Sequence, residues 1–365
     1  MGQPGGAGNA PPGRSTGGAL PIAIDACGVD GGPEVIAAAA RAVAGEGIGV
    51  RVFGLQADLV PLVGMDGVEV RRAEEAISNE EEPVRAVHQK PGASIVMAAR
   101  DVAEGNSQAL VSAGSTGAAL AASLFALRRL RGVHRPAIAV QLPLPEHPGR
   151  KVLFLDAGAN AEVRPQHLVQ FAYLGAAFSE AVLGVETPRV ALLSVGEERE
   201  KGTQTVVAAH EALAGAGGID FIGNVEGRDL VDGAADVVVA DGFTGNVALK
   251  TMEGTAKAVG GAVRGAAKSG FFAAIGGLLM RRSLKRLRRE LEPDTTGGAI
   301  LLGLRGVTVI AHGSSGPDGI ANAIRLAERS VRERAVERTA ELLERSGASR
   351  ATVRASLERD RKAAS

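Results

Sequence analysis

The charged segment GEEREKGT, residues 196–203, holds the residue types best suited to chemistry on an anion. It follows an apolar run, LLSV, that predicts a buried strand, and it precedes a predicted helix. A cation between a strand and a helix N-terminus could neutralise a phosphate or a developing oxyanion, and Lys201 occupies that position. The carboxylates of Glu197 and Glu198 could hold its ammonium group in place. Lysines in charged loops are usually only solvated, so it is the placement of Lys201 that favours a functional role.

Further candidates lie in other loops. Arg228, in GNVEGRD at residues 223–229, could bind a phosphate through two parallel hydrogen bonds. His312 could act as a base, although a lone histidine more often forms a structural hydrogen bond or a cap. Cys27 could act as a nucleophile, but no partner histidine lies nearby in the sequence, which favours a buried, unreactive thiol.

Glycine-rich segments recur where predicted strands end. Their glycines let backbone N–H groups approach a ligand, and a following helix N-terminus favours an anion, so we expect a phosphate or a phosphorylated substrate. Most glycines in such loops only form turns, and strand-ending aspartates such as Asp25, Asp156 and Asp241 cap helices as readily as they bind ligands. Neither a Walker loop nor a G-x-G-x-x-G motif is present. The segments are DACGVD (25–30), SAGSTG (112–117), DAGAN (156–160), GEEREKGT (196–203), GNVEGRD (223–229), DGFTGN (241–246) and HGSS (312–315).

Composition excludes several classes of protein. Lysine plus arginine equals aspartate plus glutamate at 41 each, and aromatic residues are only 3%, which argues against a nucleic-acid partner. The single cysteine, Cys27, excludes an intramolecular disulfide and a cysteine-rich metal site, and it suits a reducing cytoplasm. Residues 1–19 are rich in Gly and Pro, lack the apolar core of a signal peptide and are expected to be disordered. The uncharged run 105–127 is too polar for a membrane span, so none is predicted.

Strand, glycine loop and helix alternate along the chain, which predicts an α/β fold with a largely parallel sheet and helices on both faces. We expect this domain to span residues 20–330, followed by a charged C-terminal helix and tail at 331–365. The segments AIAVQLPLP and KVLFLDAGAN are expected to form neighbouring strands.

One part of the domain breaks this alternation. Residues 261–292 are predicted to form an amphipathic helical insertion, with Phe271 and Phe272 on an apolar face and Arg281 and Arg282 among the cations on the rest. Such a surface suits an anionic membrane or an acidic protein, or it is a dimer-interface helix with a solvated face.

Taken together and in order, the glycine loops resemble the PlsX family of bacterial phosphate acyltransferases. FIGNVEGRD and DGFTGNVALKTMEG are the most specific segments, and the resemblance runs from about Ile22 to Ala327. It implies a Rossmann-like three-layer α/β/α fold, akin to phosphotransacetylases and isopropylmalate dehydrogenases, with a projecting helical insertion. It also implies transfer of an acyl group from acyl-[acyl-carrier-protein] to inorganic phosphate, without a metal or an organic cofactor.

The resemblance further implies partners, a location and a set of site residues. The partners are acyl carrier protein, a second copy in a homodimer and a downstream glycerol-3-phosphate acyltransferase, at the cytoplasmic membrane surface. The expected catalytic residues are Lys201, Asn224 and Arg228. The expected substrate- and phosphate-binding residues are Asp25, Gly28, Ser115, Thr116, Gly117, Asn160, Glu198, Gly202, Asn246 and His312. The expected membrane or carrier contacts are Phe271, Phe272, Arg281 and Arg282.

The opening loop departs from the family pattern D-A-M-G-G-D-H-A-P at Cys27, Val29, Gly31 and Gly32. This departure leaves open a non-catalytic scaffold of lipid synthesis at the membrane. A separate alternative is a phosphotransacetylase that uses coenzyme A.

Overall fold

The computed structural model describes residues 19–291 and 297–348, without the side chains of residues 286–291. Nearly all of the segment expected to be disordered, residues 1–19, therefore lies outside the described residues. The same holds for the tail beyond residue 348.

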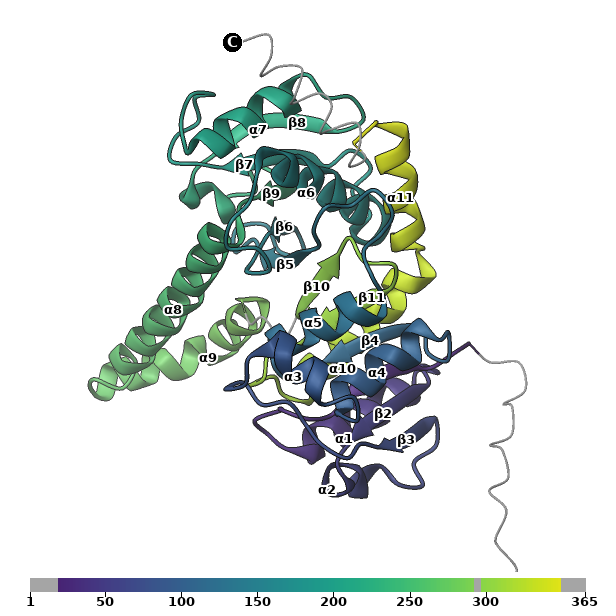
Figure 1. Ribbon diagram of the computed structural model, residues 1–365. Coiled ribbons are helices and arrows are strands. Elements are labelled where there is room, and N and C mark those ends of the chain that lie inside the picture. The colour runs from purple at the N-terminus through teal and green to yellow at the C-terminus, as the bar shows by residue number, and fades with distance from the viewer. Residues whose placement is uncertain (1–18, 292–296, 349–365) are drawn as a thin grey trace, which may run out of the picture.

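A single mixed sheet runs through the molecule in the order β3-β2-β1-β4-β11-β10-β5-β6-β9-β7-β8 (Figure 1). Antiparallel pairing is confined to β11–β10, β10–β5 and β5–β6, and every other neighbouring pair is parallel. This confirms the prediction of a largely parallel sheet, with β5 and β6 as neighbours. The strands are β1 (Ile22–Asp25), β2 (Val50–Gly54), β3 (Val68–Arg72), β4 (Ala109–Ser112), β5 (Ala137–Pro143), β6 (Lys151–Leu155), β7 (Arg189–Leu193), β8 (Asp220–Val225), β9 (Val237–Val239), β10 (Ala299–Leu302) and β11 (Val307–Ile310).

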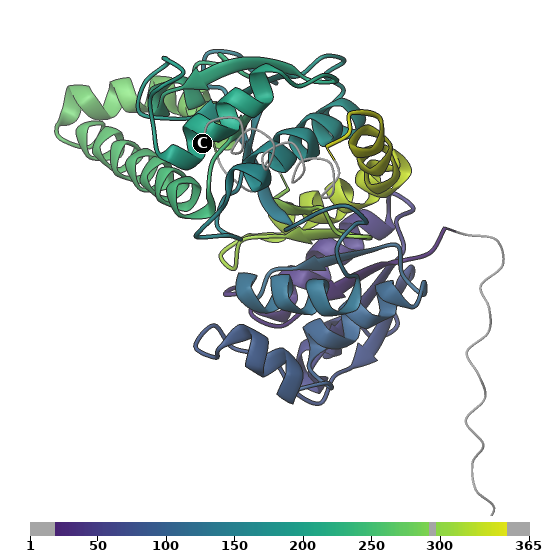
Figure 2. The same cartoon turned by 45° about the horizontal axis from the view of Figure 1, so that its top comes forward.

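Helices cover both faces of this sheet and complete the expected three-layer α/β/α arrangement (Figures 1 and 2). One face packs against α1, α6, α7, α10 and α11, and the other packs against α3, α4, α5 and α8. The helices are α1 (Pro33–Ala44), α2 (Gln56–Leu59), α3 (Pro83–Gln89), α4 (Ser94–Ala103), α5 (Thr116–Ala126), α6 (Pro165–Phe178), α7 (Gln204–Ala214), α8 (Gly242–Ala266), α9 (Phe271–Leu291), α10 (Pro317–Arg332) and α11 (Ala335–Arg345). Shorter helical turns are η1 (Val60–Leu62), η2 (Ser179–Leu183) and η3 (Gly227–Leu230).

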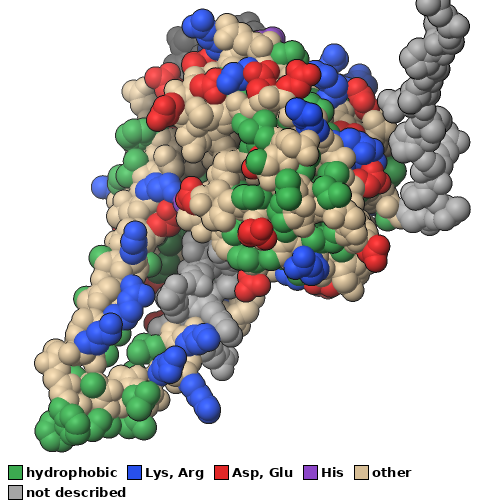
Figure 3. All heavy atoms as spheres, turned by 90° about the horizontal axis from the view of Figure 1, so that it is seen from below, with side chains coloured by type: hydrophobic (Ala, Val, Ile, Leu, Met, Phe, Trp, Pro, Cys, Tyr) green, Lys and Arg blue, Asp and Glu red, His purple; other side chains and the backbone are tan. Residues whose placement is uncertain are grey.

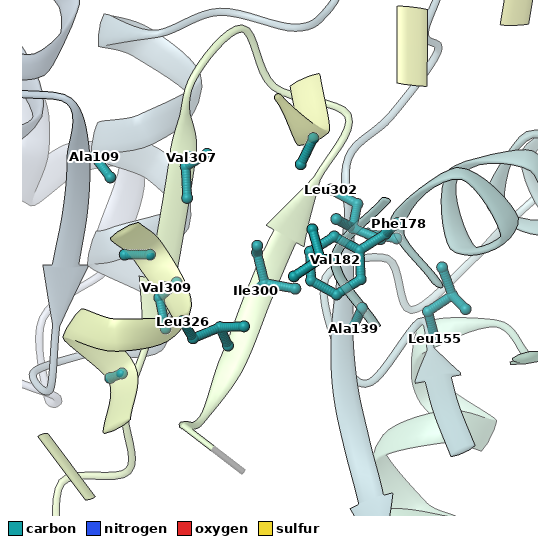
Figure 4. Close-up of a cluster of buried hydrophobic side chains, with 14 of the residues drawn as sticks. Ala109, Ala139, Leu155, Phe178, Val182, Ile300, Leu302, Val307, Val309 and Leu326 are labelled. Carbon is teal, nitrogen blue, oxygen red and sulfur yellow. The ribbon is translucent and has the colours of Figure 1, made fainter. Parts of the chain in front are cut away.

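The central strands are apolar on both sides because helices cover them above and below. Strands β1, β4 and β11 are buried at every position. Figure 4 shows Leu326 of α10 and Phe178 of α6 directed at this sheet beside Ile300 of β10. Burial of these side chains stabilises the two helices on the same face.

Residues 242–291 form a helical hairpin, α8 and α9, that projects from the rest of the molecule (Figures 1 and 2). The boundary expected at residue 261 falls inside α8, because this helix already begins at Gly242. Its first turns pack on the sheet through Ala248, Leu249 and Met252, whereas residues 254–266 are exposed. Within the two described ranges, no helix is long and apolar enough to cross a bilayer.

The part of the charged tail up to residue 348 packs into the core. Helix α11 lies against α6 and buries Leu342 and Leu343. An apolar stripe beneath its exposed charges therefore attaches this helix to the main domain.

Two glycines let α8 begin directly against the loop after β6. A Cβ on Gly242 would lie 2.6 Å from the Asn160 carbonyl oxygen, and one on Gly245 would lie 2.0 Å from the Asp156 carbonyl oxygen. The backbone N–H of Gly242 also donates to that Asn160 oxygen at 2.8 Å. Only glycine permits this approach, so DAGAN and DGFTGN form one unit.

Replacing Gly245 by alanine should therefore destabilise the protein. We expect Gly245→Ala to lower the free energy of unfolding by about 2 kcal/mol or more, because the new methyl group would force the two backbones apart. The matched control is Gly260→Ala in the same helix, where no atom lies within 4 Å of the added methyl group. That change should raise the free energy of unfolding by up to about 1 kcal/mol. Urea unfolding measures both, and equal midpoints for the two variants would contradict the packing argument.

Candidate functional site

Four neighbouring parallel strands bring most of the predicted site residues to one edge of the sheet. In the register of β6, β9, β7 and β8, Leu155 pairs with Val239, Val239 with Leu192, and Leu192 with Asn224. The segments DAGAN, DGFTGN, GEEREKGT and GNVEGRD follow these strands and share the edge, which we call the Lys201 edge. Carboxyl ends of parallel strands are where α/β folds commonly bind ligands.

The loop that carries Lys201 is held by its own backbone. The Ser194 hydroxyl donates to the Lys201 carbonyl oxygen at 2.9 Å, and the Lys201 N–H donates to the Glu198 carbonyl oxygen at 3.0 Å. The side chain of Lys201 is exposed, and in the part of the chain that the structure describes no carboxylate forms an ion pair with it. Contrary to expectation, Glu197 and Glu198 therefore do not hold the ammonium group through an ion pair. The cation is available to a ligand.

The same loop leads into a helix N-terminus. Gly202 has φ of 111°, a conformation that other residues rarely adopt, and it turns the chain into α7. The Thr203 hydroxyl caps this helix by accepting from the Val206 N–H at 3.3 Å. The partial positive charge of the N-terminus of α7 therefore lies two residues from Lys201.

Asn224 supports the Lys201 loop. Its side chain is buried, its amide donates to the Glu198 carbonyl oxygen at 2.9 Å, and its Oδ1 lies 3.0 Å from Nδ1 of His210. His210, on α7, was not anticipated, because a single histidine in a helix carries no sequence signal of this contact. Asn224 thus fixes Glu198 and, through the backbone, the position of Lys201.

Arg228 reaches the same edge but is partnered by carboxylates. Its guanidinium lies 3.2 Å from Glu226, 3.7 Å from Asp229 and 3.9 Å from Glu197. Exposed ion pairs are typically worth less than about 1 kcal/mol, so an arriving phosphate can compete for this side chain.

Asp156 organises the neighbouring loop from within. Its carboxylate accepts the backbone N–H groups of Ile138, Ala159 and Asn160 at 3.0, 2.9 and 2.8 Å. Gly158 N–H and the Asn160 side-chain amide donate to it as well. Burial raises the pKa of Asp156, and these hydrogen bonds partly offset that effect. Asn160 is thereby buried as part of the loop, whereas Asn246, on α8, is exposed and lies over Gly158.

A second group of predicted residues lies where β1, β4 and β11 end. Asp25 is buried there and accepts hydrogen bonds from the hydroxyls of Ser94 at 2.6 Å and Ser112 at 2.8 Å. Burial raises the pKa of its carboxyl group to about 6, against the opposing effect of the two serines. Asp25 therefore joins β1, β4 and the start of α4 without capping a helix. Of the three strand-ending aspartates, only Asp241 is an N-cap, accepting from the Thr244 N–H at 2.9 Å.

The loops of this second group pack on one another through glycine. A Cβ on Gly28, whose φ is 89°, would lie 2.8 Å from the Cα of Gly114. Ser115 caps α5 by accepting from the Ala118 N–H at 3.4 Å, so Thr116 and Gly117 form the first turn of this helix. His312 is exposed and accepts hydrogen bonds from the N–H and hydroxyl of Ser314, the structural role expected of a lone histidine.

Cys27 is held as a neutral thiol. Burial, followed by the charge of Asp25, raises the pKa of Cys27 to about 12, and its Sγ donates to Asp58 at 3.4 Å. This confirms the expectation of a buried cysteine.

The predicted site residues therefore fall into two groups. Lys201, Glu198, Gly202, Asn224, Arg228, Asn160 and Asn246 belong to the Lys201 edge. Asp25, Gly28, Ser115, Thr116, Gly117 and His312 lie at the ends of β1, β4 and β11. Among the described residues, no hydrogen bond or ion pair joins the two groups, and β10 and β5 lie between them in the sheet.

These features define an α/β protein with the fold of phosphotransacetylases. A phosphotransacetylase from Streptococcus pyogenes aligns with a TM-score of 0.57 and 15% identity, over 86% of this chain and 94% of that one. A branched-chain phosphotransacylase from Enterococcus faecalis aligns with a TM-score of 0.54 and 15% identity, over 86% of this chain and 100% of that one. The similarity shows the fold and confirms the fold class expected from the sequence.

Sequence comparison identifies the family. Residues 20–338 match the family model described as "Fatty acid synthesis protein". A phosphate acyltransferase of Heliobacterium modesticaldum is 44% identical over 86% of this chain and 94% of its own, and one of Thermobifida fusca is 43% identical over 85% and 87%. The chain belongs to this family, which confirms the resemblance to PlsX proteins.

Changing Asp25 should alter the pH dependence of stability. Its pKa is about 6 in the folded protein and near the ordinary 3.8 in the unfolded chain, so the folded state holds more protons between these values. The free energy of unfolding therefore falls as the pH rises from about 4 to about 6, with about 3 kcal/mol from this group. In the Asp25→Asn variant that fall should be smaller by this amount. Urea unfolding of both proteins across the range tests this, and parallel pH profiles would argue against a raised pKa.

Proposed function

We propose that this protein transfers a fatty acyl group from acyl-[acyl-carrier-protein] to inorganic phosphate, forming acyl phosphate for phospholipid synthesis. The observation that carries the proposal is the 44% identity to a phosphate acyltransferase along 94% of that relative's length. The family model matches residues 20–338, a range that includes every loop of both residue groups. Phosphate-dependent consumption of acyl-carrier protein by the purified protein is the direct assay, and a scaffold would show none.

In this reaction an oxygen of phosphate attacks the thioester carbonyl carbon. A C–O bond forms, the carbonyl becomes a tetrahedral oxyanion, and the C–S bond then breaks to release the carrier thiolate. Phosphate is already anionic and thiolate is a good leaving group, so a strong general base is not needed. The enzyme must instead bring two anionic partners together and stabilise the oxyanion.

We assign stabilisation of the oxyanion to Lys201. Among the described residues no carboxylate pairs with this exposed cation, and the N-terminus of α7 adds partial positive charge beside it. We assign Arg228 and Asn246 to substrate binding at the same edge. Asn224 serves as a positioning residue, because its side chain is already bonded to the Glu198 backbone and His210.

The projecting hairpin is proposed to contact a membrane surface. Phe271 and Phe272 at its tip are 77% and 87% exposed, and Figure 3 shows hydrophobic side chains gathered there with Lys and Arg along the two helices. An apolar tip flanked by cations suits an anionic interface. The proposal includes a homodimer at the cytoplasmic membrane surface, where the acyl phosphate passes to a glycerol-3-phosphate acyltransferase.

Lys201→Ala should lower kcat/KM for acyl phosphate formation by about 10²- to 10³-fold, the usual cost of losing one oxyanion-stabilising group. Lys201→Arg should retain part of the activity because the charge remains. The matched control is Arg199→Ala in the same loop, whose exposed side chain forms, within residues 19–291 and 297–348, an ion pair with Glu200 alone. If Lys201→Ala is folded and as active as Arg199→Ala, Lys201 does not hold this role.

Phe271→Glu should reduce flotation of the protein with anionic liposomes, because a charge at the tip opposes insertion into the interface. Val63→Glu is the control, since Val63 is similarly exposed at 67% but lies outside the hairpin. Acyl transfer in detergent-free solution should persist in both variants. Unchanged flotation of Phe271→Glu would remove the membrane role from the hairpin tip.

A further inference from the structure

Two segments of this electrically balanced chain carry arginine but no acid. There is no Asp or Glu between Glu104 and Glu146, and none from Gly297 to Pro317. The first segment contains Arg128, Arg129 and Arg131, and the second contains Arg305. We call these four residues the arginine cluster.

The fold brings the two segments together. The Arg305 N–H donates to the Arg128 carbonyl oxygen at 3.1 Å, and Arg305 Nε donates to the Arg129 carbonyl oxygen at 3.2 Å. Arg129 forms an isolated antiparallel bridge with Leu304, and its guanidinium donates to the His134 carbonyl oxygen. The loop after α5 and the turn between β10 and β11 thus form one firmly connected surface.

A shallow depression of about 380 Å³ lies within this surface. Its lining combines arginines with apolar side chains. The lining residues are Leu124, Arg128, Arg129, Leu130, Gly132, Val133 and Arg305.

The four arginines have no internal counter-charge. All four are exposed, and within the described residues none of them forms an ion pair. The partial negative charge at the C-terminus of α5 can stabilise one nearby cation. It does not stabilise four cations that lie on two different segments. Clustered like charges repel one another in the free protein, so such a surface is best explained by an anionic partner.

The cluster adjoins the Lys201 edge. Ala137 of β5 pairs with Leu302 of β10, just before the turn that carries Arg305, and the Arg135 guanidinium lies 3.5 Å from Asn160 Oδ1. From β10 to β7 the sheet order crosses β5, β6 and β9. At the usual strand spacing this is roughly 19 Å, a distance that an extended thioester-bearing arm can follow along the edge.

We propose that the arginine cluster is the docking surface for the acidic carrier protein, an inference that rests on the proposed acyl transfer. Carboxylates of the carrier would pair with the guanidinium groups, its apolar side chains would contact Leu124, Leu130 and Val133, and its arm would extend along the edge to Lys201. Arginines beside apolar side chains are typical of protein interfaces, whereas the hairpin presents exposed phenylalanines at a tip.

The test is the double charge reversal Arg128→Glu with Arg131→Glu. Neither guanidinium forms a hydrogen bond or ion pair within the described residues, so the fold should be retained. We expect KM for acyl-carrier protein to rise at least about tenfold with little change in kcat, because removing steering charges slows association. Turnover of a small acyl thioester without a carrier should be unchanged. The matched control, Arg41→Glu with Arg100→Glu on α1 and α4, makes the same change in net charge at two exposed side chains and should leave KM for the carrier substrate unaltered. Arg281→Glu with Arg282→Glu on α9 tests the hairpin as the rival carrier site.

Several results would overturn the proposal. One is an unchanged KM in the cluster variant, and another is a rise in KM in the hairpin variant alone. A third is loss of liposome flotation in the cluster variant with unaltered carrier binding, which would make the cluster a lipid-binding surface. Absence of acyl transfer by the wild type would instead refute the proposed function. In that case, binding of the unacylated carrier, measured by calorimetry on wild type and cluster variant, still decides whether the carrier docks here.

Discussion

The hydrogen bonds to the Asp156 carboxylate fix the part of the Lys201 edge formed by DAGAN and DGFTGN. A buried charge is costly unless hydrogen bonds surround it, and here backbone N–H groups of β5 and of its own loop supply them. The loop so formed presents its carbonyl oxygens to the glycines that open α8. One side chain thus fixes two strands, a loop and a helix start, and Asn246 takes its place over Gly158 as a result.

Asp25 holds the other group of loops together in a similar way, but serine hydroxyls take the place of most of the backbone donors. Both aspartates end a strand, both are buried, and neither caps a helix. The predicted ligand-binding residues therefore divide into two kinds. Some, such as Asn160 and Asn224, are buried and hold the loops together through hydrogen bonds, whereas others, such as Lys201, are exposed. The exposed charges of the edge and the hydrogen bonds that hold its loops in place are thus supplied by different side chains.

Local sequence was sufficient for most of the fold, because each strand–glycine–helix unit carries its own apolar run and its own turn. It was insufficient where long-range pairing decides the structure. Strands β10 and β11 are short and lie far along the chain from β5 and β4, their partners. Helix α3 was missed although Glu82 caps it and Pro83 opens it. The grouping of the site residues followed from the three consecutive antiparallel pairings β11–β10, β10–β5 and β5–β6, which no local pattern encodes. They direct the carboxyl ends of β6, β9, β7 and β8 to the edge of the sheet opposite to those of β1, β4 and β11. The contact between Asn224 and His210 could not be predicted from the sequence either.

Helix α8 is continuous over about 37 Å, but its two halves differ in how firmly they are held. Its first turns are clamped against the Asp156 loop, where glycine gives close contact. Beyond residue 253, a Cβ added at Gly254, Gly260, Gly261 or Gly265 would meet no described atom within 4 Å, so close packing does not require glycine there and these residues weaken the helix. The outer half of α8 is therefore the part that bends most easily. Bending there would change the angle of the tip while the anchored half, and the Asp156 loop beside it, keep their positions.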